Sequence, residues 1–149
     1  MVKRVILLDA GPLGLITNPK QSPQNTACNQ WLQSLLLAGT HVMVPEITDY
    51  EVRRELLRAR KTKGLQRLDD LVKVIEYLPL TTAVMRDAAQ LWAQIRQLGQ
   101  PTADRHALDG DVILAAQARS IPIDNVIVAT TNVGHLTRLT QAALWTDIQ

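Results

Sequence analysis

The sequence is poor in the residues on which several classes of protein depend. It contains one cysteine, Cys28, which cannot form an internal disulfide, and no C-x-x-C pair that would hold zinc. It contains no phenylalanine and only 3 Trp and 2 Tyr, so recognition of nucleobases by aromatic stacking has little support. The histidines His41, His106 and His135 lack the spacing of metal ligands. A disulfide scaffold is therefore excluded, and a reducing, cytoplasmic setting fits best.

Long hydrophobic runs are also missing. The first apolar run, Val5–Leu8, follows two basic residues, but Asp9 interrupts it after four residues, which is far short of the hydrophobic region of a signal peptide. No stretch approaches the roughly 18 apolar residues of a membrane span, so we expect no membrane partner. A Gly-rich phosphate loop, a G-x-S-x-G nucleophile motif and a Cys–His arrangement are all absent. Nucleotide binding and acyl-transfer chemistry therefore lack support.

The residues that are present suit an ordinary globular protein with an uneven charge distribution. The chain has 149 residues, of which 46% are hydrophobic and 20% charged, and we predict one domain over residues 1–149. The net charge is +2, yet residues 53–67 hold seven basic residues and one acid, a local balance of +6. Such a basic stripe suits a polyanionic partner, although a solvated helix face is the plainer interpretation of a charge run.

Short apolar runs alternate with helical patterns along the chain. Apolar runs at residues 5–8, 42–44 and 126–129 are typical of strands buried in a parallel sheet. Helical patterns are predicted from Ser22 to Gly39, over residues 47–60 with a break at Gly64, over 65–75, from Thr81 or Thr82 to Gly99, and over 109–119. We therefore predict an α/β fold, a short parallel sheet sandwiched by helices in three layers, with residues 142–148 at the sheet edge.

Acidic residues stand at the ends of predicted strands and at the starts of predicted helices. Asp9 follows the first strand, Glu51 lies on the helix after the second strand, and Asp109 and Asp111 open the Ala-rich helix. Ligands of open parallel sheets bind beyond the carboxyl ends of the strands. A cluster of carboxylates at that edge would need a divalent cation, and oxygen ligands select Mg²⁺ or Mn²⁺ over zinc.

Each of these acids also has a plainer interpretation. Asp9 is suited to turning the chain or capping a helix, and Glu51 to forming ion pairs on a wet surface. One of Asp109 and Asp111 is expected to cap its helix, and the two lie about 200° apart on a helix, so both can face one site only if Asp109 precedes the helix. Sequence reasoning leaves these alternatives open.

Four segments resemble the motifs of PIN domains and follow the order of that family. The opening strand and its acid, the second acidic segment, the third acidic segment, and the closing strand with its polar turn correspond to residues 5–13, 45–56, 108–118 and 126–136. Each motif alone is weak, whereas four in register are fairly specific and span nearly the whole chain.

The resemblance implies both an activity and the residues that carry it. PIN domains are Mg²⁺- or Mn²⁺-dependent ribonucleases, and many bacterial members are VapC-type toxins of toxin–antitoxin pairs, usually homodimers. Asp9, Glu51 and Asp111 fall on the metal-binding acids of the family, and Asp109 fits as an auxiliary ligand or a helix cap. The implied products of RNA cleavage carry 5′-phosphate and 3′-hydroxyl ends.

The chain departs from the family pattern at two places. In the last motif, the family usually has either another acid where this chain has Asn132 or an Asp where it has His135, so the site carries one negative charge fewer and a tightly held second metal is disfavoured. The small hydroxyl residue that follows the first Asp in the family is also missing, because Ala10 and Gly11 stand there.

These residues together define one functional hypothesis and two rivals. We expect Asn132 to position the attacking water or the scissile phosphate, and the substrate to be bound by Thr130, Thr131, Arg53, Arg54 and Arg58. One rival is a non-catalytic RNA- or protein-binding module on the same fold. The other is a phosphotransfer receiver domain, which is disfavoured because no acid pair follows Leu8 and no lysine lies beyond Lys73.

Overall fold

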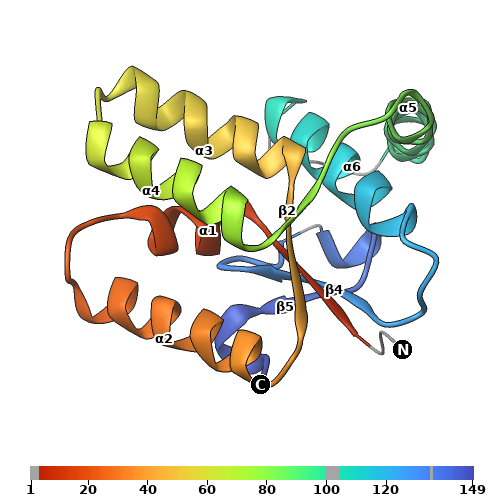
Figure 1. The fold of residues 1–149 in the computed structure, drawn as a ribbon. Helices are drawn as coiled ribbons and strands as arrows, with labels where there is room; N and C mark the ends of the chain where they lie inside the picture. The colour runs from red at the N-terminus through yellow and green to blue at the C-terminus, as the bar shows by residue number, and fades with distance from the viewer. Residues whose placement is uncertain (1–3, 100–104, 135) are drawn as a thin grey trace.

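The computed structural model describes residues 4–99, 105–134 and 136–149, with the backbone alone at 105–107, and in these residues it contains one five-stranded sheet. All four strand pairings are parallel, and the strand order is β3-β2-β1-β4-β5. The strands are β1 (Val5–Leu8), β2 (His41–Pro45), β3 (Glu76–Leu78), β4 (Val126–Thr130) and β5 (Ala142–Leu144). The predicted parallel sheet is confirmed, and β5 closes one edge as expected (Figure 1).

Helices cover both faces of this sheet in the described part of the chain. They are α1 (Ala10–Thr17), α2 (Pro23–Leu37), α3 (Glu46–Arg58), α4 (Thr62–Val74), α5 (Thr82–Gln97) and α6 (Arg105–Arg119). Successive residues of a strand point to opposite faces, so Ile6 and Leu8 join one core cluster with residues of α1, α2 and α4. Leu7 joins a second cluster, which includes Leu114 of α6. The predicted three-layer α/β/α architecture is therefore confirmed (Figure 1).

Several helix ends fall where the sequence places them. The hydroxyl of Ser22 accepts a hydrogen bond from the Asn25 backbone N–H at 3.1 Å, and Pro23 is the first residue of α2. The hydroxyl of Thr81 caps α5 in the same way, accepting from Val84 N at 3.1 Å. Ser or Thr before an apolar helical repeat is therefore a reliable start signal in this chain.

Two predictions about helices are wrong, and one helix was missed. Gly64 does not break a helix: α3 ends at Arg58, and Gly64 lies inside α4, where the missing side chain lets the helix approach Leu56. The last helix begins at Arg105 rather than 109, so Asp109 and Asp111 lie beyond its first turn and neither caps it. The sequence patterns also gave no sign of α1, which begins directly after β1.

The start of α1 is favourable for a local reason. Asp9 is its N-cap, and Pro12 is tolerated because the N–H groups of a first turn have no partner within the helix. Among the helices in this part of the chain, none combines the length and apolar character that crossing a bilayer requires.

Candidate active site at the carboxyl edge of the sheet

Asp9 is fixed between the end of β1 and the start of α1. One carboxylate oxygen, Oδ1, accepts a hydrogen bond from the backbone N–H of Ala10 at 2.7 Å. The other, Oδ2, accepts from the hydroxyl of Thr130 at 2.8 Å. In the parallel pair of β1 and β4, Leu8 lies opposite Ala129. The next residues along the two chains, Asp9 and Thr130, are therefore neighbours. The sheet register thus explains how residues far apart in the sequence meet.

Glu51 of α3 lies in the electrostatic field of two other acids. The pKa of its carboxyl is raised to about 6, first by burial and then by the negative charges of Asp9 and Asp111, against the opposing effect of Arg54. The three acids of the sequence hypothesis therefore converge, although their segments are separated by more than 40 residues in the sequence. Like charges held together in a partly buried place favour a cation between them.

Glu51 also lies directly against α6. A Cβ atom at Gly110 would stand only 3.0 Å from Glu51 Oε2, so glycine at this position leaves room for the carboxylate. The donor set of the site consists of carboxylate oxygens alone, which suits Mg²⁺ or Mn²⁺. In the part of the chain that the structure describes, no group of three acids, histidines or cysteines is close enough to hold an ion directly. Mg²⁺ commonly keeps several of its waters, which allows carboxylates to hold it at longer range.

Asp109 lies apart from this convergence. It lines a shallow apolar groove between α5 and α6, together with Met85, Trp92 and Val112. The separation of Asp109 and Asp111 around the helix explains the result, because α6 begins four residues before Asp109 and both acids are helical. The structure thus brings Asp111, and not Asp109, toward Glu51.

Asn132 occupies a turn just beyond β4. Its side-chain Oδ1 accepts a hydrogen bond from the Gly134 backbone N–H at 3.1 Å, and Gly134 has a positive φ of 43°. Asn132 is therefore a turn residue in this structure, and its side chain is exposed, with Oδ1 used within the turn. His135, the other departure from the family motif, lies outside the described residues.

The two threonines after β4 differ in accessibility. Thr130 is buried, with 2% of its surface exposed, and its hydroxyl is engaged by Asp9. Thr131 is exposed, and its side chain packs so closely on Gly11 of α1 that a Cβ at Gly11 would overlap it. The side chain of Thr131 therefore occupies the space that a side chain at position 11 would need.

The three arginines expected to bind substrate have different partners. Arg53 is paired with Asp49 at 3.0 Å and with Asp69 of α4 at 2.7 Å, so it joins two helices. Arg58 is paired with Glu55 at 2.9 Å on the surface. Arg54 is exposed, stacks on the ring of Tyr50 at 5.1 Å, and lowers the pKa of Glu51.

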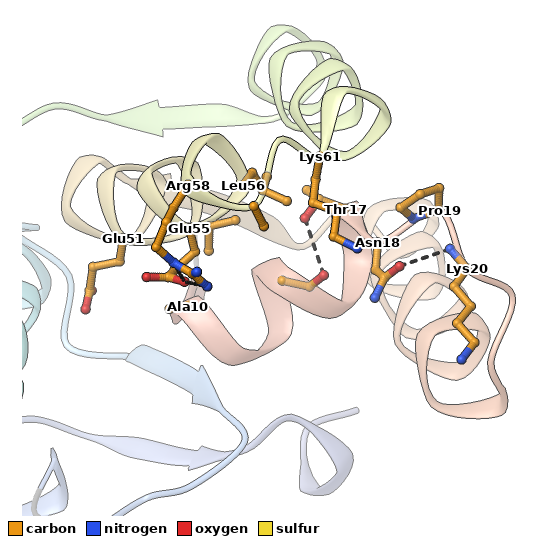
Figure 2. A pocket seen from close by; sticks show the side chains of 13 residues that line it. Ala10, Thr17, Asn18, Pro19, Lys20, Glu51, Glu55, Leu56, Arg58 and Lys61 are labelled. Carbon is orange, nitrogen blue, oxygen red and sulfur yellow. Dashed lines mark hydrogen bonds and ion pairs between the residues drawn. The ribbon is translucent and has the colours of Figure 1, made fainter.

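A groove of about 600 Å³ runs from Glu51 along α1 and α3. Figure 2 shows Glu51 at one end and the side chains of Lys20 and Lys61 toward the other, with Glu55 and Arg58 over Ala10. Sequence reasoning missed Lys20, which has no motif around it, and included Lys61 only as a member of the basic stripe. The groove thus joins the acidic centre to two cationic side chains.

Gln117 is a second residue that sequence reasoning missed. It is fully buried in α6, and its amide donates to the carbonyl of Leu78 at 2.8 Å and accepts from the N–H of Ile47 at 3.3 Å. The first turn of α3 has no side-chain cap of its own, because its N-cap is Pro45. Gln117 therefore connects the helix that carries Asp111 to the helix that carries Glu51. A lone glutamine in an apolar helical stripe is the signal that sequence reasoning passed over.

Comparison with solved structures identifies the fold. No model of a protein family matches the chain, and neither does any curated protein. A chain in the structure of VapBC2 from Rickettsia felis bound to a DNA fragment from their promoter superposes with a TM-score of 0.71 at 15% identity, over 95% of this chain and 98% of that chain.

Two further structures give the same result. A chain of FitAcB from Neisseria gonorrhoeae has a TM-score of 0.69 at 24% identity, and a chain of VapBC-1 from nontypeable Haemophilus influenzae has 0.69 at 18%. Each match covers 96% of this chain and 99% of the other. At these identities the likeness establishes the fold, which is the PIN-like three-layer architecture that the four sequence motifs predicted.

Proposed function

We propose that this chain with a PIN-like fold is a metal-dependent endoribonuclease and the toxin component of a type II toxin–antitoxin pair. The observation that carries the proposal is the convergence of Asp9, Glu51 and Asp111, which is expressed in the raised pKa of Glu51. Carboxylates from the end of a strand and from two helices meet at the carboxyl edge of a parallel sheet, where open α/β folds bind their ligands.

Asp9, Glu51 and Asp111 would hold one Mg²⁺ or Mn²⁺ ion with waters bridging part of its contacts, since the three carboxylates are too far apart to chelate it together without waters. When bound, the ion supplies Lewis-acid chemistry, which acidifies a water and offsets charge growing on the phosphate. Asp109 is left out of this ligand set because it faces α5. The lower charge contributed by Asn132 favours one ion over two, as the sequence suggested.

The other side chains bind and orient the RNA. Asn132 donates from Nδ2 to the water or to a phosphate oxygen, because its Oδ1 is used in the turn. Arg54, Lys20 and Lys61 offer positive charge to the RNA backbone without reading its sequence. Arg58 can also bind the RNA backbone if its ion pair with Glu55 opens. That pair is exposed, so breaking it costs little free energy. Cleavage leaves 5′-phosphate and 3′-hydroxyl ends.

The proposed biological setting rests on the solved structures of similar fold. Those structures are VapBC and FitAB complexes, in which toxin and antitoxin chains assemble. We infer by this likeness an antitoxin protein as a partner. The homodimeric state and the cytoplasmic location are proposed from the resemblance to the PIN family and from the composition. Burial of the lone Cys28 raises the pKa of its thiol to about 12, which makes the thiol a poor nucleophile.

The double variant Asp9→Asn with Asp111→Asn tests the proposed chemistry. We expect loss of Mn²⁺-dependent RNA cleavage while far-UV circular dichroism and RNA binding persist, since the amides keep the side-chain shape and remove the charge. Asp109→Asn is the matched control on the same helix, and it should cleave RNA at nearly the wild-type rate. Full cleavage by the double variant would refute the metal-dependent mechanism.

One observation favours a second candidate function. Because no three potential ligands in the described ranges are close enough to chelate an ion directly, a non-catalytic RNA- or protein-binding module on the same fold remains the alternative. A Mn²⁺ titration separates the two functions. The module predicts no thermal stabilisation by Mn²⁺ and no cleavage, whereas the nuclease predicts both.

A further inference from the structure

We propose that Thr130 is a positioning residue that holds the Asp9 carboxylate in the orientation required for metal binding. The inference deepens the proposed nuclease function and rests on it. It assigns to the first hydroxyl after β4 a role inside the protein, in place of the contact with substrate that the sequence suggested.

The hydrogen bonds around Thr130 form a short relay from the polar turn to the acid. The backbone N–H of Asn132 donates to Thr130 Oγ1 at 3.2 Å, and Oγ1 donates to Asp9 Oδ2 at 2.8 Å. The carbonyl of Asn132 is also within 3.1 Å of the hydroxyl, but it is the weaker acceptor because it is neutral and farther away. The single hydroxyl hydrogen is therefore directed at the carboxylate.

Burial sets the role of this hydroxyl. Only 2% of the surface of Thr130 is exposed, so the side chain does not reach a bound RNA. A buried hydroxyl without an acceptor would carry a desolvation cost, and Asp9 supplies that acceptor. The contact is thus maintained by the fold itself, whether or not RNA is present.

Each oxygen of the Asp9 carboxylate accepts a hydrogen bond, so the orientation of the group is fixed. Oδ1 accepts from Ala10 N at 2.7 Å and Oδ2 from Thr130 at 2.8 Å, which fixes the plane of the group. Each carboxylate oxygen can accept more than one contact, so both retain capacity for a cation or its waters. Partners that orient ligands in this way are typically worth about 10- to 100-fold in metal affinity or activity.

The neighbouring residues offer no other side-chain hydroxyl that could replace the hydrogen bond from Thr130 to Asp9. Residues 10 and 11, which follow Asp9, are alanine and glycine, so α1 offers Asp9 only its backbone N–H. Thr131 is exposed and packs on Gly11, and no hydrogen bond between it and Asp9 is found among the described residues. Loss of the Thr130 hydroxyl would therefore free Oδ2 and release the turn at Asn132 from its anchor.

Thr130→Val and Thr130→Ser separate the hydroxyl from the packing. Valine keeps the branched shape without the hydroxyl, and serine keeps the hydroxyl without the methyl group. We expect Thr130→Val to weaken Mn²⁺ binding, measured by calorimetry, by about tenfold and to lower kcat for RNA cleavage with little change in KM. Thr130→Ser should stay within about threefold of wild type in both quantities. Thr130→Ala, compared with Thr130→Ser, replaces Thr130→Val if the valine variant does not fold.

The outcomes distinguish this inference from the proposed function. If wild type binds Mn²⁺ and cleaves RNA, and Thr130→Val matches it in Mn²⁺ affinity and kcat, the positioning role is wrong and the nuclease stands. If valine and serine variants lose affinity equally, the methyl group and not the hydroxyl matters, which also overturns the inference. If wild type neither binds Mn²⁺ nor cleaves RNA, both proposals fail.

Discussion

The Glu51 carboxylate lies against the backbone of Gly110, so that a Cβ atom there would stand 3.0 Å from Oε2 and 3.5 Å from Oε1. This contact is where α3 meets α6, and it brings Glu51 toward Asp111, the next residue of α6. A glycine inside a helix is normally unfavourable by about 0.5–1 kcal/mol relative to alanine. Here glycine serves a purpose despite that cost, because a side chain at position 110 would crowd the Glu51 carboxylate.

Gly110→Ala should weaken function more than it weakens the fold. The added methyl group displaces Glu51, so we expect Mn²⁺ affinity to fall by about tenfold. The gain in helix propensity offsets the strain, and the free energy of unfolding should change by less than about 1 kcal/mol. Calorimetric Mn²⁺ binding and urea unfolding measure the two effects.

Gly14→Ala in α1 is the matched control for that variant. A Cβ at Gly14 would meet no atom within 4 Å, so the methyl group should stabilise the helix and leave Mn²⁺ affinity unchanged. An unchanged Mn²⁺ affinity in Gly110→Ala as well would show that Glu51 does not depend on this space.

Glu51→Gln should raise stability at neutral pH in metal-free buffer. The folded pKa of Glu51 is about 6 and its ordinary value is 4.5, so the unfolded chain loses the proton first as pH rises. Stability therefore falls between pH 4.5 and 6 and stays lower above that window. After allowance for solvent screening, we expect a gain on the order of 1 kcal/mol at pH 7.5 and none near pH 4.

Glu55→Gln provides the comparison for this pH dependence. Glu55 lies one turn further along α3, is exposed, and has its pKa lowered by the hydrogen bond and charge of Arg58. Its replacement should give no gain in stability at pH 7.5 in urea unfolding. A wild-type protein that is equally stable at pH 4 and pH 7.5, with Glu51→Gln indistinguishable from it, would contradict the clustering of acids.

The meeting of Asp9 with Thr130 was predictable, because the ends of parallel strands are brought to one edge of the sheet by topology. The apolar run before Asp9 identifies β1, and the run before Thr130 identifies β4, so their convergence follows from the sheet alone. The position of Glu51 could not be predicted from the sheet, because a residue on a helix faces the site only if the helix is turned about its own axis in the right direction. Here the resemblance to the family supplied what periodicity did not.

The parts that escaped prediction depend on contacts between distant segments. Gly64 was expected to break a helix, yet it lies inside α4, and Gly11 lies inside α1; at both positions the missing side chain leaves room for a distant side chain, Leu56 or Thr131. Tertiary packing thus overrides helix propensity at these two positions. The start of α6 was missed because Asp109 resembles an N-cap, although the helix extends back to Arg105.

The neighbouring residues Arg53 and Arg54 should separate stability from RNA binding. Arg53 is held by Asp49 and Asp69, so Arg53→Ala should lower the free energy of unfolding by about 1 kcal/mol and leave RNA affinity nearly unchanged. Arg54→Ala should weaken RNA binding and reduce the slope of affinity against salt by about one ion, with little effect on stability. Fluorescence anisotropy at several salt concentrations measures both affinities, and the reverse pattern would exclude Arg54 as a phosphate contact.

Gln117→Leu should destabilise the connection between α3 and α6. Leucine fills a similar volume but leaves the N–H of Ile47 and the carbonyl of Leu78 without their present partner, which costs roughly 1–3 kcal/mol for each buried group. Thermal unfolding should show the loss. Unfolding of Gln117→Leu at the wild-type temperature would show that the two hydrogen bonds do not stabilise this connection.

A crystal structure of the protein soaked in Mn²⁺ tests the metal site most directly, because anomalous scattering locates the ion without reference to activity. We expect one Mn²⁺ peak among Asp9, Glu51 and Asp111, bound by their oxygens or through waters, and no peak at Asp109. A well-ordered crystal with no peak at these three acids, or with its only peak elsewhere, would contradict the proposed nuclease site.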